Sequence, residues 1–182
     1  MDELQKIVIV GKSCSGKTNL QNRFIKLGFT PAILTTSRPK RENETDGENY
    51  HFLSKSEMNV IEQHDGFLDK QSYREFDYGI TFEEFIRSNL LILTPKNIKS
   101  LKQHNLLKDV LIIYIETSHG IRYKRTLKRL STYDDKNKRW VEDDNDFENF
   151  RDFDLKLQVN SEQILDNLEQ LITTIHNIHK KN

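Results

Sequence analysis

The segment that follows the first apolar run of the chain has residue types and spacing suited to binding phosphate through its main chain. It matches the pattern G-x-x-x-x-G-K-[ST], with a buried strand expected before it and a helix after it. The glycines let consecutive N–H groups point inward, and the start of the helix adds the positive end of its dipole. The pattern predicts a nucleotide-binding loop that consists of Gly11, Lys12, Ser13, Cys14, Ser15, Gly16, Lys17 and Thr18.

Two side chains of this loop add chemistry of their own. In loops of this pattern the lysine, here Lys17, reaches the β- and γ-phosphates of a nucleoside triphosphate. The hydroxyl group that follows, on Thr18, is placed to hold Mg²⁺. The loop therefore predicts a bound nucleoside triphosphate, Mg²⁺ as the cofactor and Thr18 as the metal ligand.

A second basic segment, residues 37–52, could hold another phosphate. Arg38 and Arg41 are three residues apart, and a turn at Asp46-Gly47 and then Tyr50 follow them. Guanidinium groups bind phosphate oxygens in pairs, and a phenol donates one further hydrogen bond. From the residues alone two interpretations are open, a clamp for a second phosphate and a solvated basic turn.

This segment resembles the signature of the guanylate kinase family. In that family a threonine-rich turn and the pattern R-x-x-R-x-G-E-x-D-G-x-x-Y-x-F bind the phosphate of GMP. The same order of motifs continues along most of the chain, at residues 66–69, 78–79 and 159–160 and in a lid segment. The residues that match the signature are Arg38, Arg41, Glu44, Asp46, Gly47, Tyr50 and Phe52, and those at the positions of the lid arginines are Arg125, Arg129 and Arg139.

The resemblance implies an enzyme that transfers the terminal phosphoryl group of ATP to a nucleoside monophosphate, with GMP or dGMP as the first candidates. It implies that Lys17, Arg129 and Arg139, together with the arginines of the acceptor segment, spread the charge of the transferring group. Glu44 would orient those arginines, and Asp69 stands where the family has the glutamate that contacts the base. The implied acceptor site consists of Arg38, Arg41, Glu44, Tyr50, Asp69 and Tyr78.

Several positions depart from the family's pattern. Leu34 and Ile80 replace residues that carry hydroxyl groups, and Asp69 replaces the longer glutamate. Each lost hydrogen bond weakens the discrimination of a base by about 1 kcal/mol or more, so strict specificity for GMP is not expected. Thr94 stands where the family has an aspartate that helps to organise Mg²⁺.

These departures leave two alternatives beside a nucleoside monophosphate kinase. One is a kinase of a phosphorylated sugar of the ribose bisphosphate type, because a branch of the superfamily uses the same phosphate clamp without a guanine site. The other is a non-catalytic nucleotide-binding or interaction module, as guanylate-kinase-like domains of scaffold proteins are. The presence of Lys17, Thr18 and the lid arginines favours ATP handling over such a module.

The hydrophobic pattern predicts an α/β fold whose parallel central sheet presents these sites. Continuous apolar runs of four to six residues are typical of strands that are covered on both faces. Apolar residues at helical spacing predict helices at residues 16–27, 55–64 and around 98–106, an exposed helical hairpin at 122–151 and a closing helix around 164–175. The expected strands are Lys6–Val10, Ala32–Thr36, Leu90–Leu93, Val110–Ile115 and Leu155–Val159.

This order of elements corresponds to the three-layer fold of P-loop NTPases. We expect one guanylate-kinase-like domain over residues 1–182. Within it, a small inserted subdomain that binds the nucleoside monophosphate is expected at about 37–79 and a helical lid at about 121–151. The expected core comprises about 1–36, 80–120 and 152–182.

The composition indicates which partners to expect. The 28 Lys and Arg residues balance the 28 Asp and Glu residues, so no overall field attracts the chain to nucleic acid or to a membrane surface. The single cysteine, Cys14, excludes an intramolecular disulfide and fits a reducing compartment. No apolar run approaches the roughly 20 residues that span a bilayer. We therefore expect a cytoplasmic protein. The partners that the loop and the resemblance imply are ATP and a nucleoside monophosphate, and the expected state is a monomer or homodimer.

Overall fold

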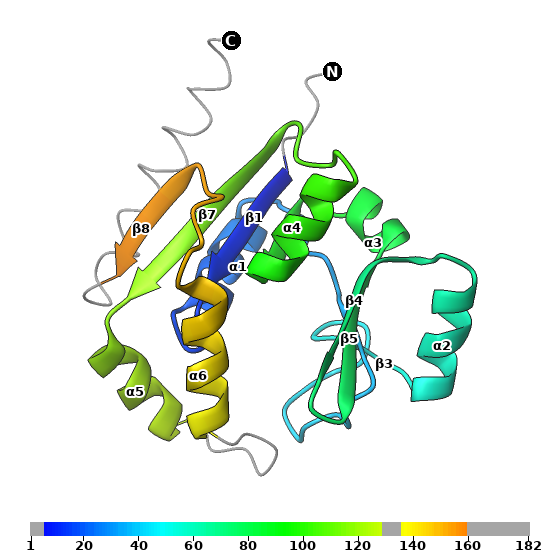
Figure 1. Ribbon diagram of the computed structural model, residues 1–182, viewed down its shortest axis with the longest axis horizontal. Coiled ribbons are helices and arrows are strands. Elements are labelled where there is room, and N and C mark those ends of the chain that lie inside the picture. The colour runs from blue at the N-terminus through cyan, green and yellow to red at the C-terminus, as the bar shows by residue number, and fades with distance from the viewer. Residues whose placement is uncertain (1–5, 129–135, 160–182) are drawn as a thin grey trace.

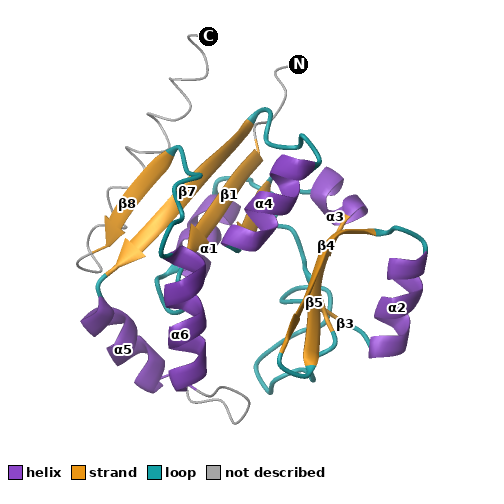
Figure 2. Ribbon diagram, in the orientation of Figure 1, coloured by secondary structure: helices purple, strands orange, loops and turns teal. Residues whose placement is uncertain are grey.

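The computed structural model describes residues 6–128 and 136–159, which form two sheets with helices around them (Figure 1; Figure 2). One sheet is entirely parallel and forms the centre of the molecule, and a smaller mixed sheet lies beside it. The predicted α/β class with a parallel central sheet is confirmed. The predicted closing helix around 164–175 lies outside the described residues.

The central sheet has the strand order β6-β1-β7-β8, and every pairing in it is parallel. Alternate residues belong to two hydrophobic clusters, Val8 and Val10 to one and Ile7 and Ile9 to the other. Because both faces of the sheet are covered, its strands are continuously apolar, and this pattern made them predictable. The strands span Lys6–Gly11 (β1), Leu90–Leu93 (β6), Val110–Thr117 (β7) and Leu155–Val159 (β8).

Helices cover both faces of the central sheet, which gives the core three layers (Figure 1). On one face α1 (Lys17–Lys26) packs through Leu20 against β1 and β7. On the other face α4 (Pro95–Gln103) packs through Ile98. Both helices follow the carboxyl end of a central strand, so their first turns lie at the same edge of the sheet.

The second sheet has the strand order β3-β2-β5-β4 and contains a β-hairpin that the hydrophobic pattern did not predict. The hairpin turns at Arg74, whose φ is 58°. Most residues of β4 are half-buried, so the strand shows neither a continuous apolar run nor a clear alternation. The strands span Thr35–Thr36 (β2), His51–Phe52 (β3), Phe67–Tyr73 (β4) and Phe76–Thr81 (β5).

Two helices flank the second sheet. The first, α2 (Lys55–Gln63), confirms the helix predicted from the sequence and begins with a capping box between Ser54 and Glu57. The second, α3 (Phe82–Arg87), was not predicted, because its 6 residues are too few to show a helical period.

The prediction of one strand over Ala32–Thr36 is wrong. Pro31 makes an isolated parallel bridge with Leu90 at the edge of the central sheet, whereas Thr35 and Thr36 form β2 of the other sheet. Proline has no N–H group to donate, so a regular strand does not extend from it into the central sheet. The chain instead crosses from one sheet to the other within this segment.

The charged segment after β7 forms α5 (His119–Lys128) and α6 (Lys136–Phe147), which confirms the predicted helices. Each helix has exposed residues, as predicted, but each also has a buried side that was not predicted. Arg122 of α5 is only 4% exposed. Phe147 of α6 stacks on Tyr114 of the central sheet, with 5.6 Å between the ring centroids. The segment has so many charged residues that its sequence does not indicate which side of each helix faces inward.

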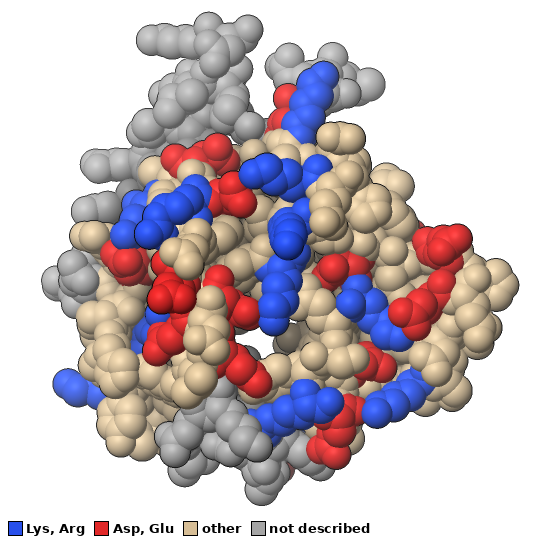
Figure 3. Space-filling model, in the orientation of Figure 1, with Lys and Arg blue, Asp and Glu red and all other residues tan. Residues whose placement is uncertain are grey.

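The described surface mixes acidic and basic side chains, as Figure 3 shows across α4 and α6. Lys96 of α4 pairs with Asp146 of α6 at 3.2 Å, and Lys102 pairs with Asp152 at 3.0 Å. Within residues 6–128 and 136–159, no helix has the length and apolar character required to traverse a membrane.

Replacing Leu20 by alanine should destabilise the fold, because its side chain is fully buried between α1 and the central sheet. We expect Leu20→Ala to lower the free energy of unfolding by about 2–5 kcal/mol through lost burial and the cavity left behind. Leu27→Ala, at the exposed end of the same helix, should change it by only about 0.5 kcal/mol. Urea denaturation measures both, and equal losses would contradict the packing of α1.

Candidate functional site

The phosphate loop joins β1 to α1, and its two glycines are required by the geometry. A Cβ atom at Gly11 would lie 2.8 Å from the carbonyl oxygen of Ile115 in β7, closer than real contacts allow. Gly16 has a φ of 108°, which side chains disfavour, and it caps the start of α1. Gly16 offers no side-chain cap, so the first amides of α1 can donate to a bound anion.

Lys17 and Thr18 begin α1 and face the cleft beside the loop. The Lys17 ammonium group donates to the carbonyl oxygens of Gly11 at 2.6 Å and Lys12 at 3.0 Å, so it lies over the loop. Thr18 is exposed and lines the cleft. Cys14, at the turn of the loop, has a φ of 59° and accepts a hydrogen bond from Thr126.

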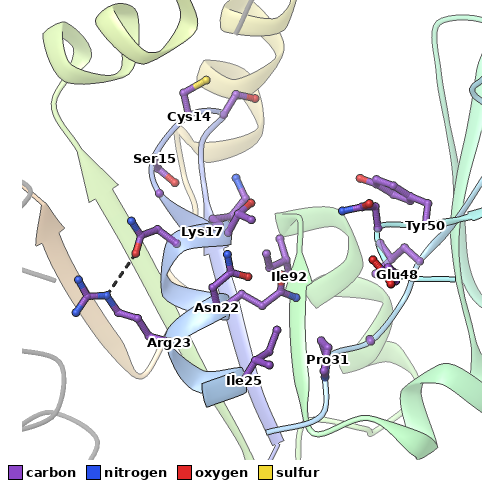
Figure 4. A pocket seen from close by; sticks show the side chains of 18 of the residues that line it. Cys14, Ser15, Lys17, Asn22, Arg23, Ile25, Pro31, Glu48, Tyr50 and Ile92 are labelled. Atoms are coloured by element: carbon purple, nitrogen blue, oxygen red, sulfur yellow. Dashed lines mark hydrogen bonds between the residues drawn. The ribbon is translucent and has the colours of Figure 1, made fainter. Parts of the chain in front are cut away.

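The cleft has a volume of about 880 Å³ and separates the phosphate loop from the acceptor segment. Residues 13–18 and one side of α1 form the first wall. Figure 4 shows Lys17 on this wall and Glu48 and Tyr50 on the opposite one. Binding cavities for small molecules span about 300–1,000 Å³, so the cleft can hold a phosphorylated ligand between its two walls.

An ion cluster at the second wall consists of Glu44, which lines the cleft, and of Arg38 and Arg41, which do not. Arg38 is 4% exposed, and its two terminal nitrogens donate to the two carboxylate oxygens of Glu44 at 2.9 and 2.8 Å. The main-chain N–H of Arg41 donates to Glu44 at 2.9 Å, and its guanidinium group lies 3.5 Å from the same carboxylate. Glu44 thus holds the two guanidinium groups close together.

Aromatic rings pack against Arg38 of this cluster. The guanidinium carbon of Arg38 lies 5.6 Å from the ring centroid of Tyr50 and 5.5 Å from that of Phe52. Tyr78, in β5, has its ring centroid 6.2 Å from that of Tyr50. These contacts desolvate Arg38 and strengthen its ion pair with Glu44.

The structure brings most of the predicted acceptor residues together but exposes few of them to the cleft. Glu44 and Tyr50 line the cleft, whereas Arg38, Arg41 and Tyr78 are not among its lining residues. The arginines therefore lie beneath Glu44 and Tyr50 and not on the surface that faces Lys17.

Asp69, predicted to contact the base, lies away from the cleft and is held by two amide groups. Gln71 donates to its carboxylate at 2.7 Å, and Asn97 of α4 donates to the same oxygen. Asn97 also forms a capping box with Thr94, whose hydroxyl accepts the main-chain N–H of Asn97 at 3.2 Å. Thr94, at the expected aspartate position, therefore caps α4.

The predicted lid arginines are only partly described. Arg129 lies outside the described residues, and for Arg139 the structure describes the main chain of α6 but not the side chain. Arg125, on α5, lines the cleft and donates to the carbonyl oxygens of Ser15 at 3.1 Å and Cys14 at 3.3 Å. The sequence placed Arg125 among the lid arginines but did not assign it to the phosphate loop, because that contact joins residues 110 positions apart.

Burial and ion pairing shift the pKa of Glu44 in opposite directions. Burial alone would raise the pKa of Glu44, but the hydrogen bonds from Arg38 and Arg41 and their positive charges together lower it. A carboxylate with a lowered pKa in the folded state stabilises the fold above its unfolded pKa, here about 4.5. That stabilisation is lost as the pH falls through the folded pKa.

We therefore expect Glu44→Gln to be less stable than the wild type at neutral pH, with a difference that narrows as the pH falls below about 4.5. Urea denaturation of both proteins between about pH 7 and pH 3 measures the two stability curves. Curves that stay parallel over this range would mean that the ion cluster does not stabilise the fold.

The comparisons with known proteins agree with this geometry. The family model described as "Guanylate kinase" matches residues 3–177. The human protein PALS2 is 30% identical over 116 residues, which cover 59% of the chain but 22% of PALS2. MAGUK p55 subfamily member 7 of Danio rerio is 28% identical over 146 residues, covering 74% of the chain and 25% of the relative.

A bacterial enzyme and a solved structure extend the comparison. The guanylate kinase of Chlorobium luteolum is 30% identical over 80 residues, covering 43% of the chain and 41% of that enzyme. The crystal structure of guanylate kinase from Anaplasma phagocytophilum superimposes with a TM-score of 0.69 and 13% identity, covering 94% of the chain and 87% of the match. This likeness supports the P-loop NTPase fold, and with the family match over nearly its whole length the chain belongs to the guanylate kinase family.

Proposed function

We propose that the chain transfers the terminal phosphoryl group of ATP to a nucleoside monophosphate, with GMP or dGMP as the first acceptors to test. One observation carries the proposal: the phosphate loop and the acceptor segment form opposite walls of the same cleft. Phosphoryl transfer needs little covalent help from the protein and depends on positioning and on stabilising charge. A donor site on one wall and an acceptor site behind the other wall of this cleft would supply the positioning.

On the donor side, amides of the phosphate loop and of the first turn of α1 would hold the phosphates of ATP. The Lys17 ammonium group, which lies over the Gly11 and Lys12 carbonyls, would move to the phosphates when they enter. Its positive charge would then stabilise the charge that develops on the transferring group. Arg125, already bonded to the loop, lies close enough to contribute to the same charge stabilisation.

The donor side also fits magnesium bound to ATP. Thr18 offers an exposed hydroxyl group in the cleft, whereas the Thr94 hydroxyl is engaged in capping α4. Within the part of the chain that the structure describes, no group of three or more His, Cys, Asp or Glu side chains could hold a metal ion. Thr18 would therefore be the protein ligand, with ATP oxygens and water completing the usual oxygen coordination. When bound, the ion neutralises phosphate charge.

On the acceptor side, Arg38, Arg41, Tyr50 and Tyr78 would bind the phosphate of the nucleoside monophosphate. A guanidinium group has five N–H donors, and the bonds of Arg38 to Glu44 and Pro39 use three of them. The remaining donors can bind a phosphate once the Glu44 and Tyr50 side chains admit it. Glu44 would keep both arginines in place before the acceptor arrives.

The side chains near the expected base site do not favour one base strongly. Ile80 is 1% exposed and belongs to the hydrophobic core, Leu34 lines the cleft, and Asp69 is engaged by Gln71 and Asn97. Few polar groups therefore remain that could form hydrogen bonds with guanine. A sugar phosphate acceptor, which needs only the phosphate clamp, belongs in the same assay.

The second candidate function is a non-catalytic module of the guanylate kinase type. The specific observation in its favour is the sequence similarity to PALS2 and to MAGUK p55 subfamily member 7. Thr94, which caps α4, also provides no carboxylate at the position where the family has an aspartate that helps to organise Mg²⁺. Against this candidate, Lys17, Thr18 and Arg125 surround a cleft that has the size of a nucleotide site.

Lys17→Ala should abolish phosphoryl transfer. We expect kcat to fall by about 10²–10³-fold or more, because the variant lacks the charge that stabilises the transferring group. A coupled assay of ADP release, run with each nucleoside monophosphate, its deoxy form and ribose bisphosphate, measures the activity. Lys26→Ala, an exposed lysine at the other end of α1, is the matched control.

The same assay distinguishes the candidate functions. Activity that persists in Lys17→Ala would show that the loop is not the donor site. If the wild-type protein binds ATP or GMP in calorimetry but phosphorylates none of the acceptors, the non-catalytic module is correct.

Arg41→Met should impair the acceptor side alone. The variant loses a charge-assisted contact with phosphate, which is typically worth about 1.5–3 kcal/mol. We therefore expect the acceptor KM to rise by at least about tenfold and kcat to fall, while the KM for ATP stays unchanged. Lys40→Met, at the exposed neighbouring position, should leave all three constants near their wild-type values. Steady-state kinetics with each substrate varied in turn provides the test, and an unaltered acceptor KM would assign Arg41 to another task.

A further inference from the structure

The helix α6 binds the phosphate loop directly through Asp143. The main-chain N–H of Ser13 donates to one carboxylate oxygen of Asp143 at 2.8 Å, and the Ser13 hydroxyl donates to the other at 3.2 Å. The Asp143 side chain is 15% exposed. A carboxylate beside a loop built to bind phosphate repels that ligand unless a cation neutralises it, and this requirement points to Arg122.

Arg122 of α5 pairs with Asp143 and binds the same loop residue. Its Nε donates to the carbonyl oxygen of Ser13 at 2.9 Å, and its Nη2 donates to Asp143 at 2.9 Å. The guanidinium carbon lies 4.4 Å from the ring centroid of Trp140, which covers it. Arg122, Asp143 and Ser13 thus form a closed ring of hydrogen bonds that engages the N–H, the C=O and the hydroxyl of Ser13. We call this ring the Ser13 clamp.

The clamp fixes the two peptide planes on either side of Ser13. In a trans peptide the C=O and the N–H point in opposite directions. The Ser13 N–H points to Asp143, so the Lys12 carbonyl of the same peptide plane points the other way. On that side the carbonyl oxygen accepts a hydrogen bond from the Lys17 ammonium group at 3.0 Å. Because the Ser13 carbonyl points to Arg122, the N–H of Cys14 points away from Arg122. Both planes therefore depend on side chains of α5 and α6.

Stability alone does not account for a buried ion pair at this place. Arg122 is 4% exposed, and a buried pair is often no more stabilising than apolar residues of similar volume. A buried, hydrogen-bonded pair does hold its partners in one geometry. Here the group that is held belongs to the loop that binds the donor phosphates.

We propose that Arg122 and Asp143 are positioning residues for ATP, which set the peptide planes of the phosphate loop from the lid helices. The inference rests on the proposed binding of ATP by residues 11–18 and goes beyond it, because neither residue belongs to the loop or to the acceptor site. Tethering the loop in its binding geometry before ATP arrives lowers the cost of ordering it on binding.

A neighbouring contact of similar chemistry provides the control. Asp144, the next residue of α6, pairs with Lys12 at 2.5 Å, but its side chain is 61% exposed. An ion pair with one largely exposed partner contributes little, and this pair involves the Lys12 side chain and not the main chain of the loop. Its removal tests whether any acidic contact from α6 has the same effect as the clamp.

The test compares ATP binding in the full chain by isothermal titration calorimetry with Mg²⁺. The double variant Arg122→Leu/Asp143→Ala removes both charges and leaves no lone buried charge, and circular dichroism with thermal unfolding checks that it folds. We expect its Kd for ATP to rise at least about tenfold, with the Kd for the acceptor nucleotide within about threefold of the wild-type value. Asp144→Ala should keep both constants within about threefold.

Further measurements separate positioning from a general structural role. Asp143→Asn retains an acceptor for the Ser13 N–H, so its Kd for ATP should lie between those of the wild type and the double variant. Equal ATP affinity in the wild type and a folded double variant would overturn the inference while the proposed function stands. Affinity lost equally for ATP and the acceptor would also overturn it, in favour of a structural role. A wild-type protein that binds no ATP would overturn both proposals.

Discussion

Main-chain binding of phosphate requires peptide groups whose N–H bonds converge, and the proposed function depends on this constraint. The loop begins at Gly11, the last residue of β1. A side chain at Gly11 would collide with the carbonyl oxygen of Ile115 in the neighbouring strand. The parallel pairing of β1 with β7 brings that carbonyl to the loop. The central sheet thus sets the start of the loop, and α1 sets its end.

Carboxylates organise the cations on both sides of the cleft. Glu44 gathers Arg38 and Arg41 beneath the acceptor wall, and Asp143 holds Arg122 beside the phosphate loop. A chain with equal numbers of acidic and basic residues has no overall field, so its anion sites are built from local arrangements of this kind. In each arrangement the acidic partner keeps the guanidinium group in place at a position where it would otherwise be costly to bury.

The sequence predicted those parts of the molecule that local pattern determines. The central strands follow from apolar runs covered on both faces, and the phosphate loop follows from glycines whose spacing reflects its own geometry. The cluster of Arg38, Arg41 and Glu44 was expected from a family signature, and the structure brings the three residues together.

Other features depend on tertiary contacts and leave little trace in the sequence. The strands β4 and β5 are half-exposed, and the inward sides of α5 and α6 are masked by charge. The contact of Arg122 with Ser13 joins residues 109 positions apart, and that of Asp143 joins residues 130 positions apart. Asp69 has the residue type expected at a base site, yet Asn97, from another element, decides where its carboxylate lies.

Two of the contacts that α6 makes lie about one turn apart, that of Asp143 with the phosphate loop and that of Phe147 with Tyr114 of the central sheet. A helix is stiff over one turn, so these attachments cannot shift independently. Packing in the aromatic part of the core and the shape of the loop are consequently linked in free energy. If nucleotide binding alters the contact between Phe147 and Tyr114, a change in that contact alters nucleotide affinity by an equivalent free energy, because such coupling is reciprocal.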